Sequence, residues 1–123
     1  MDLKQGYFEE PAGARRRFCQ FLRLNPATIE EYKYWHDGHN IWPEIPEGIC
    51  KAGILDMEIY LIEDKAFMIV EAPLGFDWNA AFGYLATLER QAEWEAFVGK
   101  FQDSGEGLRS EEKWQLMERV FSL

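Results

Sequence analysis

The chain has few basic residues, few cysteines and no long apolar run. Lys and Arg number 13 against 22 Asp and Glu, which gives a formal net charge of −9 at pH 7. Nucleic acids and anionic membranes bind basic surfaces, so neither class of partner is expected. No segment approaches the roughly 20 apolar residues of a membrane-spanning helix, and the first residues lack the apolar core of a signal peptide. We therefore predict a cytoplasmic protein with no nucleic-acid or membrane partner.

Motifs for cofactors and activated nucleophiles are also missing. The chain contains no GxGxxG, GxxxxGK[S/T] or GxSxG pattern, so neither a nucleotide cofactor nor a serine nucleophile is expected. The two cysteines, Cys19 and Cys50, lie in apolar runs without CxxC spacing. This is typical of small hydrophobic residues in a reducing compartment.

Apolar side chains, by contrast, are plentiful. Hydrophobic residues make up 47% of the 123 residues and aromatic residues 15%, which is enough for one packed core and too much for a disordered chain. The first 14 residues are polar and contain Gly6, Pro11 and Gly13, which predicts a loosely held extension. We assign residues 1–16 to this N-terminal extension and residues 17–123 to a single domain.

The apolar periodicity predicts four strands and two pairs of helices. The strands are expected at 18–24, 57–62, 66–72 and 119–123, and the helices at 28–36, at 43–52, after Asp77 and around Trp94. This order is the ferredoxin-like α+β pattern, a four-stranded antiparallel sheet with helices on one face. Residues 67–70 are continuously apolar, so both faces of the sheet should be covered. We therefore expect a homodimer through the open sheet face.

Acid–base side chains gather near the end of the first predicted helix. Tyr32 and His36 are four residues apart, so a helix places the phenol and the imidazole on one face. Histidine is the side chain best able to exchange a proton near pH 7. A phenol beside an imidazole suits proton transfer to the hydroxyl and ether oxygens of a sugar.

Other interpretations of these residues remain open. His36 alone also fits a helix C-cap at the negative end of the helix dipole. His36, Asp37, His39 and Glu44 are all capable metal ligands, although zinc sites normally use different spacings. Trp94 lies on an apolar helical stripe, which is typical of a core residue, and an indole is also a good platform for a sugar ring.

Several short motifs together resemble those of the L-rhamnose mutarotase family. They are Asn25-Pro26, Glu31-Tyr32-x3-His36, Ile41-Trp42-Pro43-Glu44, Gly53-Ile54, Glu58-Ile59-Tyr60-Leu61, Phe67-Met68, Glu71 and Trp94. The resemblance covers the chain from about Arg17 to the C-terminus. It implies a dimeric α/β barrel of ferredoxin-like subunits, which interconverts the anomers of a 6-deoxy-L-hexose without metal or cofactor.

The resemblance also assigns roles to residues. It implies that His36 is the proton donor, that Tyr32 binds substrate and that Trp94 contacts the sugar. Four residues separate His36 from Ile41, which is more than the family's usual spacing, so His39 competes for the catalytic role. We assign that role to His36, because only His36 keeps the i, i+4 relation to Tyr32.

Two presumed sugar contacts differ from the family pattern. Glu93 stands in the place of a tryptophan, and Met57 in the place of a tyrosine. Because these contacts change while the presumed acid is kept, we expect the same reaction on a related sugar, with L-fucose favoured over L-rhamnose. Substrate-binding candidates are therefore Trp94, Glu93, Met57 and His39. The alternatives are a cofactor-free monooxygenase-like protein and a non-catalytic sugar-binding protein on the same fold.

Overall fold

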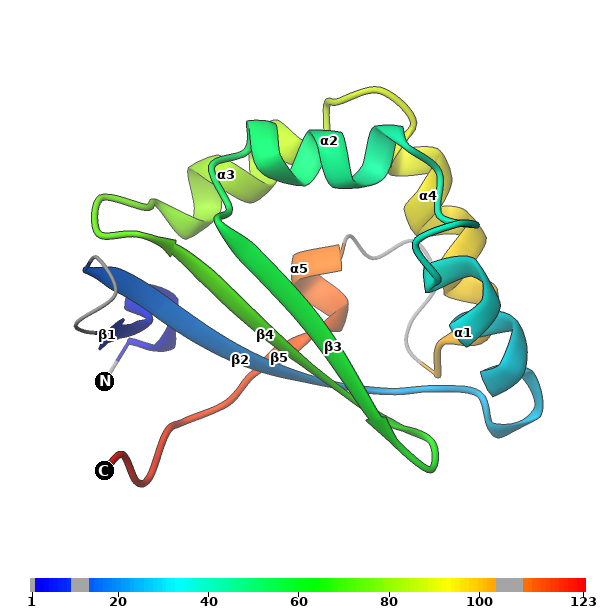
Figure 1. Ribbon diagram of the computed structural model, residues 1–123, viewed down its shortest axis with the longest axis horizontal. Coiled ribbons are helices and arrows are strands. Elements are labelled where there is room, and N and C mark those ends of the chain that lie inside the picture. The colour runs from blue at the N-terminus through cyan, green and yellow to red at the C-terminus, as the bar shows by residue number, and fades with distance from the viewer. Residues whose placement is uncertain (1, 10–13, 104–109) are drawn as a thin grey trace.

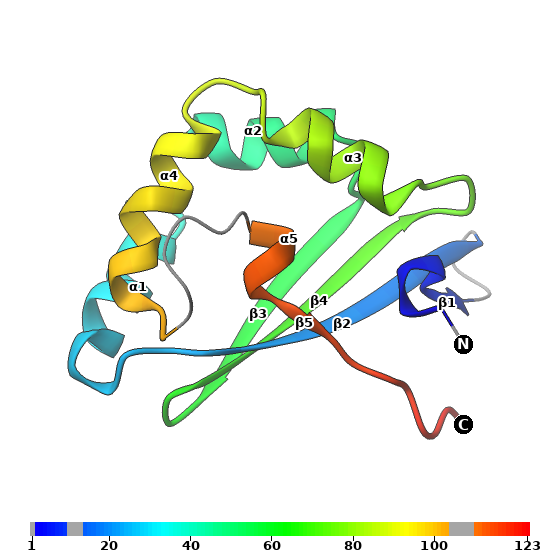
Figure 2. The ribbon, with the colours of Figure 1, turned by 180° about the vertical axis from the view of Figure 1, so that it is seen from behind.

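The structure is a computed structural model that describes residues 2–9, 14–103 and 110–123. Its elements in chain order are η1 (Leu3–Gln5), β1 (Tyr7–Glu9), β2 (Arg15–Arg23), η2 (Pro26–Thr28), α1 (Ile29–His36), α2 (Glu44–Lys51), β3 (Asp56–Ile62), β4 (Lys65–Pro73), α3 (Trp78–Leu85), α4 (Gln91–Val98), η3 (Gly99–Phe101), α5 (Ser110–Lys113) and β5 (Gln115–Leu116). The helices arch over one face of the sheet, and the two termini lie on the same side of the molecule (Figures 1 and 2). No helix among the described residues has the length and apolarity needed to cross a bilayer.

The sheet is antiparallel throughout. Its order is β1-β2-β4-β3, and β5 also pairs with β2. Without β1, the order β5-β2-β4-β3 is the arrangement expected of a ferredoxin-like subunit. The predicted α+β class with an antiparallel sheet is therefore confirmed. The predicted count of four strands is wrong, because Tyr7–Glu9 form a strand against Arg15–Arg17. This part of the extension, predicted to be loosely held, is paired with the sheet.

The two ends of the chain share one edge of β2. β1 pairs with Arg15–Arg17, while β5 pairs with Gln20 and Phe21. A closing strand predicted at 119–123 would have to continue along β2 into positions that β1 already occupies. The strand therefore ends at Leu116, and the backbone N–H of Arg119 donates to the Tyr7 hydroxyl instead. For the same reason the strand predicted to begin at residue 18 begins at Arg15, where β1 provides a partner.

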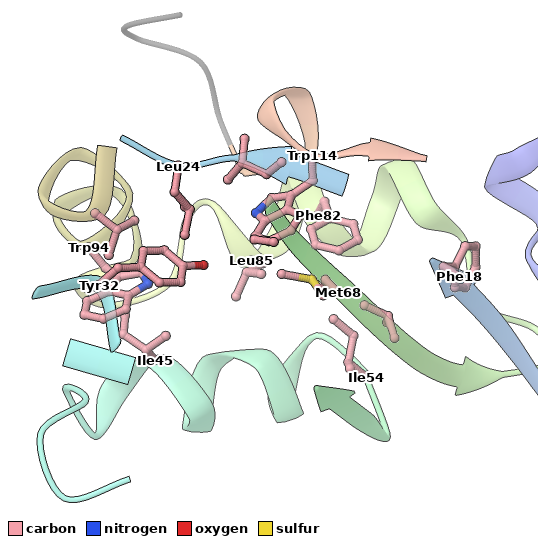
Figure 3. Close-up of a cluster of buried hydrophobic side chains, with 14 of the residues drawn as sticks. Phe18, Leu24, Tyr32, Ile45, Ile54, Met68, Phe82, Leu85, Trp94 and Trp114 are labelled. Carbon is pink, nitrogen blue, oxygen red and sulfur yellow. The ribbon is translucent and has the colours of Figure 1, made fainter. Parts of the chain in front are cut away.

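Side chains on β2 and β4 alternate between the helix layer and the open face. In β4, Met68 and Val70 are buried beneath the helices, whereas Phe67 and Ile69 are only half-buried. Figure 3 shows the core that results, in which Met68 of β4 lies close to Phe82 and Leu85 of α3, while Phe18 of β2 lies farther along the sheet. The open face keeps apolar side chains, among them Tyr60 and Ile62, which are 53% and 58% exposed.

Gly6 adopts a backbone conformation that other residues tolerate poorly. Its φ of 68° and ψ of −178° lie in a region used almost only by glycine, and a Cβ there would sit 2.8 Å from the Phe18 ring. Gly6→Ala is expected to lower the free energy of unfolding by roughly 1–3 kcal/mol, measured by urea denaturation. Gly83→Ala is the matched control, since nothing lies within 4 Å of its Cβ in α3. A Gly6→Ala variant as stable as the wild type would contradict this account.

Candidate active site

A cavity of about 470 Å³ lies between the helix layer and the sheet. Its lining comes from every layer of the fold: Gln20 of β2, Tyr32 and His36 of α1, Ile45 and Ile49 of α2, Met57 and Ile59 of β3, Met68 of β4, Phe82 and Leu85 of α3, Gln91 and Trp94 of α4, Gln102 directly after η3 and Trp114 directly after α5. Most of these side chains are apolar, and the polar ones are few. This is the usual composition of a site for a small organic ligand.

The aromatic pair expected on the first helix is present. α1 carries Tyr32 and His36 one turn apart, with ring centroids 4.0 Å from each other and an interplanar angle of 28°. Tyr32 is buried and His36 is half-buried, and both line the cavity. The helical i, i+4 spacing is the direct cause of this stacking.

One hydrogen bond determines the proton state of His36. Its Nδ1 lies 2.7 Å from the backbone carbonyl oxygen of Tyr32. Because a carbonyl oxygen only accepts, Nδ1 carries the proton, and Nε2 of the neutral ring keeps its lone pair. Nε2 has no hydrogen bond to any described residue. The bond therefore serves as a helix cap and also leaves a basic nitrogen available on a residue that lines the cavity.

Burial keeps both rings uncharged. Desolvation lowers the pKa of His36 below its ordinary value, outweighing the opposing effect of the hydrogen bond to Tyr32. Desolvation also raises the pKa of the Tyr32 phenol. The Tyr32 hydroxyl has no hydrogen-bond partner among the described residues. In Figure 3 it points toward the middle of the cluster, on the side of Leu85 and Trp114.

Trp94 belongs to the core and to the cavity wall at once. It is 6% exposed and lies edge-on to His36, with centroids 5.3 Å apart, and to Trp42, 5.1 Å apart. The Arg90 guanidinium stacks on the other indole, 3.9 Å from the Trp42 ring centroid. The two interpretations of Trp94, core residue and sugar platform, are therefore compatible in this structure.

The remaining predicted site residues separate into two groups. Met57 of β3 is half-buried and lines the cavity. His39 is exposed beyond the end of α1, where its backbone N–H donates to the Asp37 carboxylate at 2.9 Å. The Glu93 side chain is 61% exposed and pairs with Arg90 at 3.1 Å. The structure thus brings Tyr32, His36, Trp94 and Met57 together and places His39 and Glu93 outside the cavity.

Three glutamines in the cavity wall were missed by the sequence reasoning. The amide oxygens of Gln20, Gln91 and Gln102 are buried and have no hydrogen-bond partner among the described residues. A signal for Gln20 was present, because alternation along β2 places it on the same face as the core residues Phe18 and Leu22. Nothing in the sequence marks Gln102.

Metal-ligating side chains form no cluster in the part of the chain that the structure describes. Within 2–9, 14–103 and 110–123, no three His, Cys, Asp or Glu side chains are close enough together to hold an ion. His36 directs one nitrogen to a backbone carbonyl, and His39 is exposed.

Comparison with known proteins identifies the family to which the chain belongs. The sequence profile of the L-rhamnose mutarotase family matches residues 17–123. The chain belongs to this family. An L-fucose mutarotase of Xanthomonas campestris pv. campestris is 32% identical over 110 residues, which cover 88% of each chain. An L-rhamnose mutarotase of Burkholderia ambifaria is 32% identical over 94 residues, covering 75% of this chain and 85% of the relative. The predicted resemblance and the predicted class of enzyme, a carbohydrate isomerase, are confirmed.

The fold is shared with a solved member of the same family. The crystal structure of an L-rhamnose mutarotase from Formosa agariphila matches with a TM-score of 0.65 and 18% identity, covering 88% of this chain and 98% of that one. This likeness supports the α+β architecture with its antiparallel sheet. The family match begins at residue 17, so β1 and the start of β2 lie before it.

Proposed function

We propose that the chain interconverts the α and β anomers of a 6-deoxy-L-hexose, L-fucose or L-rhamnose, by acid–base opening and closure of the ring. The observation that carries this proposal is a neutral imidazole with an unprotonated Nε2, stacked on a phenol with an unpaired hydroxyl, at the wall of one cavity. The favouring of L-fucose stays a prediction, supported by the fucose mutarotase among the relatives. Cytoplasmic residence also stays a prediction.

The proton state of His36 suggests the order of proton transfer. In the neutral ring, Nε2 accepts the proton of the anomeric hydroxyl as the bond between C1 and the ring oxygen breaks. The imidazolium then returns the same proton to the former ring oxygen, which gives the open-chain aldehyde. Rotation about C1–C2 and the reverse transfers give the other anomer. In this order His36 acts first as the base and then as the proton donor, which is the role that the resemblance implied for it.

Tyr32 and Trp94 hold the sugar for this exchange. Because desolvation raises its pKa, the Tyr32 phenol stays protonated and donates a hydrogen bond to a sugar oxygen rather than giving up its proton. Trp94 and Met57 supply apolar surface for the C–H side of the ring and for the methyl group. The order of transfers and these contacts are proposals of mechanism.

The test of this function is saturation-transfer proton NMR between the two anomeric signals of each sugar, with and without protein. We expect enhanced exchange for L-fucose or L-rhamnose. A folded protein that enhances neither exchange would disprove the proposed function. The sugar with the larger enhancement is the preferred substrate.

The rate should depend on pH through the neutral form of His36. Its lowered pKa means that kcat/KM is flat at neutral and alkaline pH and falls about tenfold per pH unit only below that pKa, which lies under 6.5. The same shift makes the unfolded chain bind the proton first, so folding stability falls as the pH drops below 6.5. Anomer-exchange rates between pH 4.5 and 8 check this. An anomer-exchange rate that increases as the pH falls would contradict this prediction and would mean that the protonated imidazolium of His36 is the active form.

We further propose that two copies pair through the open sheet face into a dimeric α/β barrel. The support is the apolar surface left there: Phe21 and Phe67 pack with centroids 5.5 Å apart, and Tyr60 and Ile62 are more than half exposed. Phe67→Lys is expected to shift the dimer to monomer in sedimentation velocity, since it places an unpaired charge in the interface. Tyr84→Lys on α3, also at an exposed aromatic residue, is the control. A wild-type chain that sediments as a monomer would contradict the proposal.

A further inference from the structure

The cavity wall carries more unpaired polar atoms than the proton transfer uses. Besides the Tyr32 hydroxyl, the amide oxygens of Gln20, Gln91 and Gln102 have no hydrogen-bond partner among the described residues. Gln20 and Gln91 are only 2% and 5% exposed, so bulk water cannot easily solvate them. Buried polar groups in proteins are normally paired, and those that are not call for an explanation. These atoms belong to β2, α1, α4 and the segment after η3, and they all border one cavity.

The fold holds these glutamines in fixed places. Gln20 is in the middle of β2, opposite Met68 of β4 and next to β5. Gln91 is the first residue of α4, one turn before Trp94, and its backbone N–H donates to Leu88. Gln102 forms an isolated bridge with Leu24. Side chains anchored on paired backbone in this way are organised before any ligand arrives, which favours selective binding.

Their chemistry matches that of neutral hydroxyl groups. An amide oxygen accepts the proton of an O–H, and an amide attracts neither a carboxylate nor a phosphate as a charged group would. The cavity lining also contains apolar side chains, Ile45, Leu85 and Val98 among them. The cavity therefore offers acceptors for ring hydroxyls and apolar surface for a methyl group.

We propose that Gln20 and Gln91, assisted by Gln102, bind the secondary hydroxyls of the sugar ring and set the preference between sugars that differ in the configuration of those hydroxyls. This inference rests on the proposed function. L-Fucose and L-rhamnose differ in the configuration of the hydroxyls at C2 and C4, so residues that accept from ring hydroxyls are the ones able to distinguish them. His36 performs the proton transfer, and the glutamines determine which sugar is presented to it.

The experiment replaces each glutamine by leucine and measures three quantities: KM, kcat and the melting temperature. For Gln20→Leu and Gln91→Leu we expect KM to rise roughly three- to tenfold, the equivalent of one neutral hydrogen bond. We expect kcat to change little, because the lost contact is made equally in the ground and transition states. The ratio of kcat/KM between the two sugars should move toward one.

Stability separates a binding role from a structural one. Removing an unpaired buried polar atom should leave the melting temperature of the sugar-free protein unchanged or raise it. A lower melting temperature with unchanged KM would show that the glutamine serves only the fold, and unchanged values of all three quantities would also overturn the proposal. Gln5→Leu is the matched control, since Gln5 is exposed on η1, outside the cavity. If a leucine variant does not fold, the corresponding Gln→Met variant carries the same test.

The result can be distinguished from a failure of the proposed function. If the wild type enhances anomer exchange for neither L-fucose nor L-rhamnose, the proposed function is disproved. Binding of L-fucose and L-rhamnose can then still be followed by tryptophan fluorescence, because Trp94 and Trp114 line the cavity. In that assay the Gln20→Leu and Gln91→Leu variants are expected to bind the preferred sugar three- to tenfold more weakly. Equal binding by wild type and variants would overturn the role of the glutamines.

Discussion

Replacing His36 by glutamine is expected to lower kcat for anomer exchange by about 10²–10⁴, the usual contribution of one positioned general acid–base residue. The Nδ1–H bond to the Tyr32 carbonyl leaves Nε2 as the proton acceptor, and no other imidazole lines the cavity among the described residues. Glutamine has similar length and remains polar, but it cannot exchange a proton near pH 7. Saturation-transfer NMR at saturating sugar measures the loss directly.

His39→Gln is the matched control for this prediction. The two histidines are three residues apart, yet His39 is exposed, and its backbone N–H donates to the Asp37 carboxylate. We expect His39→Gln to keep the wild-type rate, and both variants to keep the wild-type circular dichroism spectrum. Full activity in a folded His36→Gln variant together with a loss in His39→Gln would move the catalytic role to His39.

Trp94→Ala is expected to lower the free energy of unfolding by roughly 3–5 kcal/mol, the usual cost of truncating a buried aromatic residue to alanine. Trp94 is 6% exposed and contacts His36, Trp42 and Phe97, with ring centroids between 5.1 and 6.1 Å apart. Its removal leaves a void at the junction of α1, α2 and α4. Because small domains are stable by only about 5–15 kcal/mol, this variant should be close to unfolding at physiological temperature.

Two further variants make the Trp94 prediction specific. Trp94→Phe keeps an aromatic ring in the cluster and should recover most of the stability lost in Trp94→Ala. Tyr34→Ala removes an aromatic side chain from α1 that is 55% exposed, and it should cost far less. Urea denaturation compares the three variants. A Trp94→Ala variant within about 1 kcal/mol of the wild type would mean that the aromatic cluster does not hold the helices together.

Local sequence was sufficient for the parts of the site that lie within one element. Tyr32 and His36 stack because a helix brings residues four apart onto one face, whatever the rest of the fold does. The alternation along β2 and β4 likewise determines which residues point toward the helices. The strand order was readable because short connections leave few ways to arrange four strands and two helix pairs.

Tertiary structure decided what depends on residues far apart in the chain. Glu93 was predicted to contact the sugar, but the side of α4 it occupies faces Arg90 and solvent, and only packing could show this. The last strand is short because β1, about a hundred residues earlier in the chain, already occupies the edge of β2, and no local pattern reports that competition.

Two further properties arise only in the folded protein: the lowered pKa of His36 and the unpaired amide oxygens of Gln20, Gln91 and Gln102. Both depend on the exclusion of water from a cavity that several elements form together. The sequence by itself determined the fold class, the stacking of Tyr32 on His36 and the family. Tertiary structure decided the proton state of that pair and which polar atoms are left for a ligand. The physical reason is that side-chain spacing is a local property, whereas desolvation and hydrogen-bond satisfaction are set by every neighbour in space.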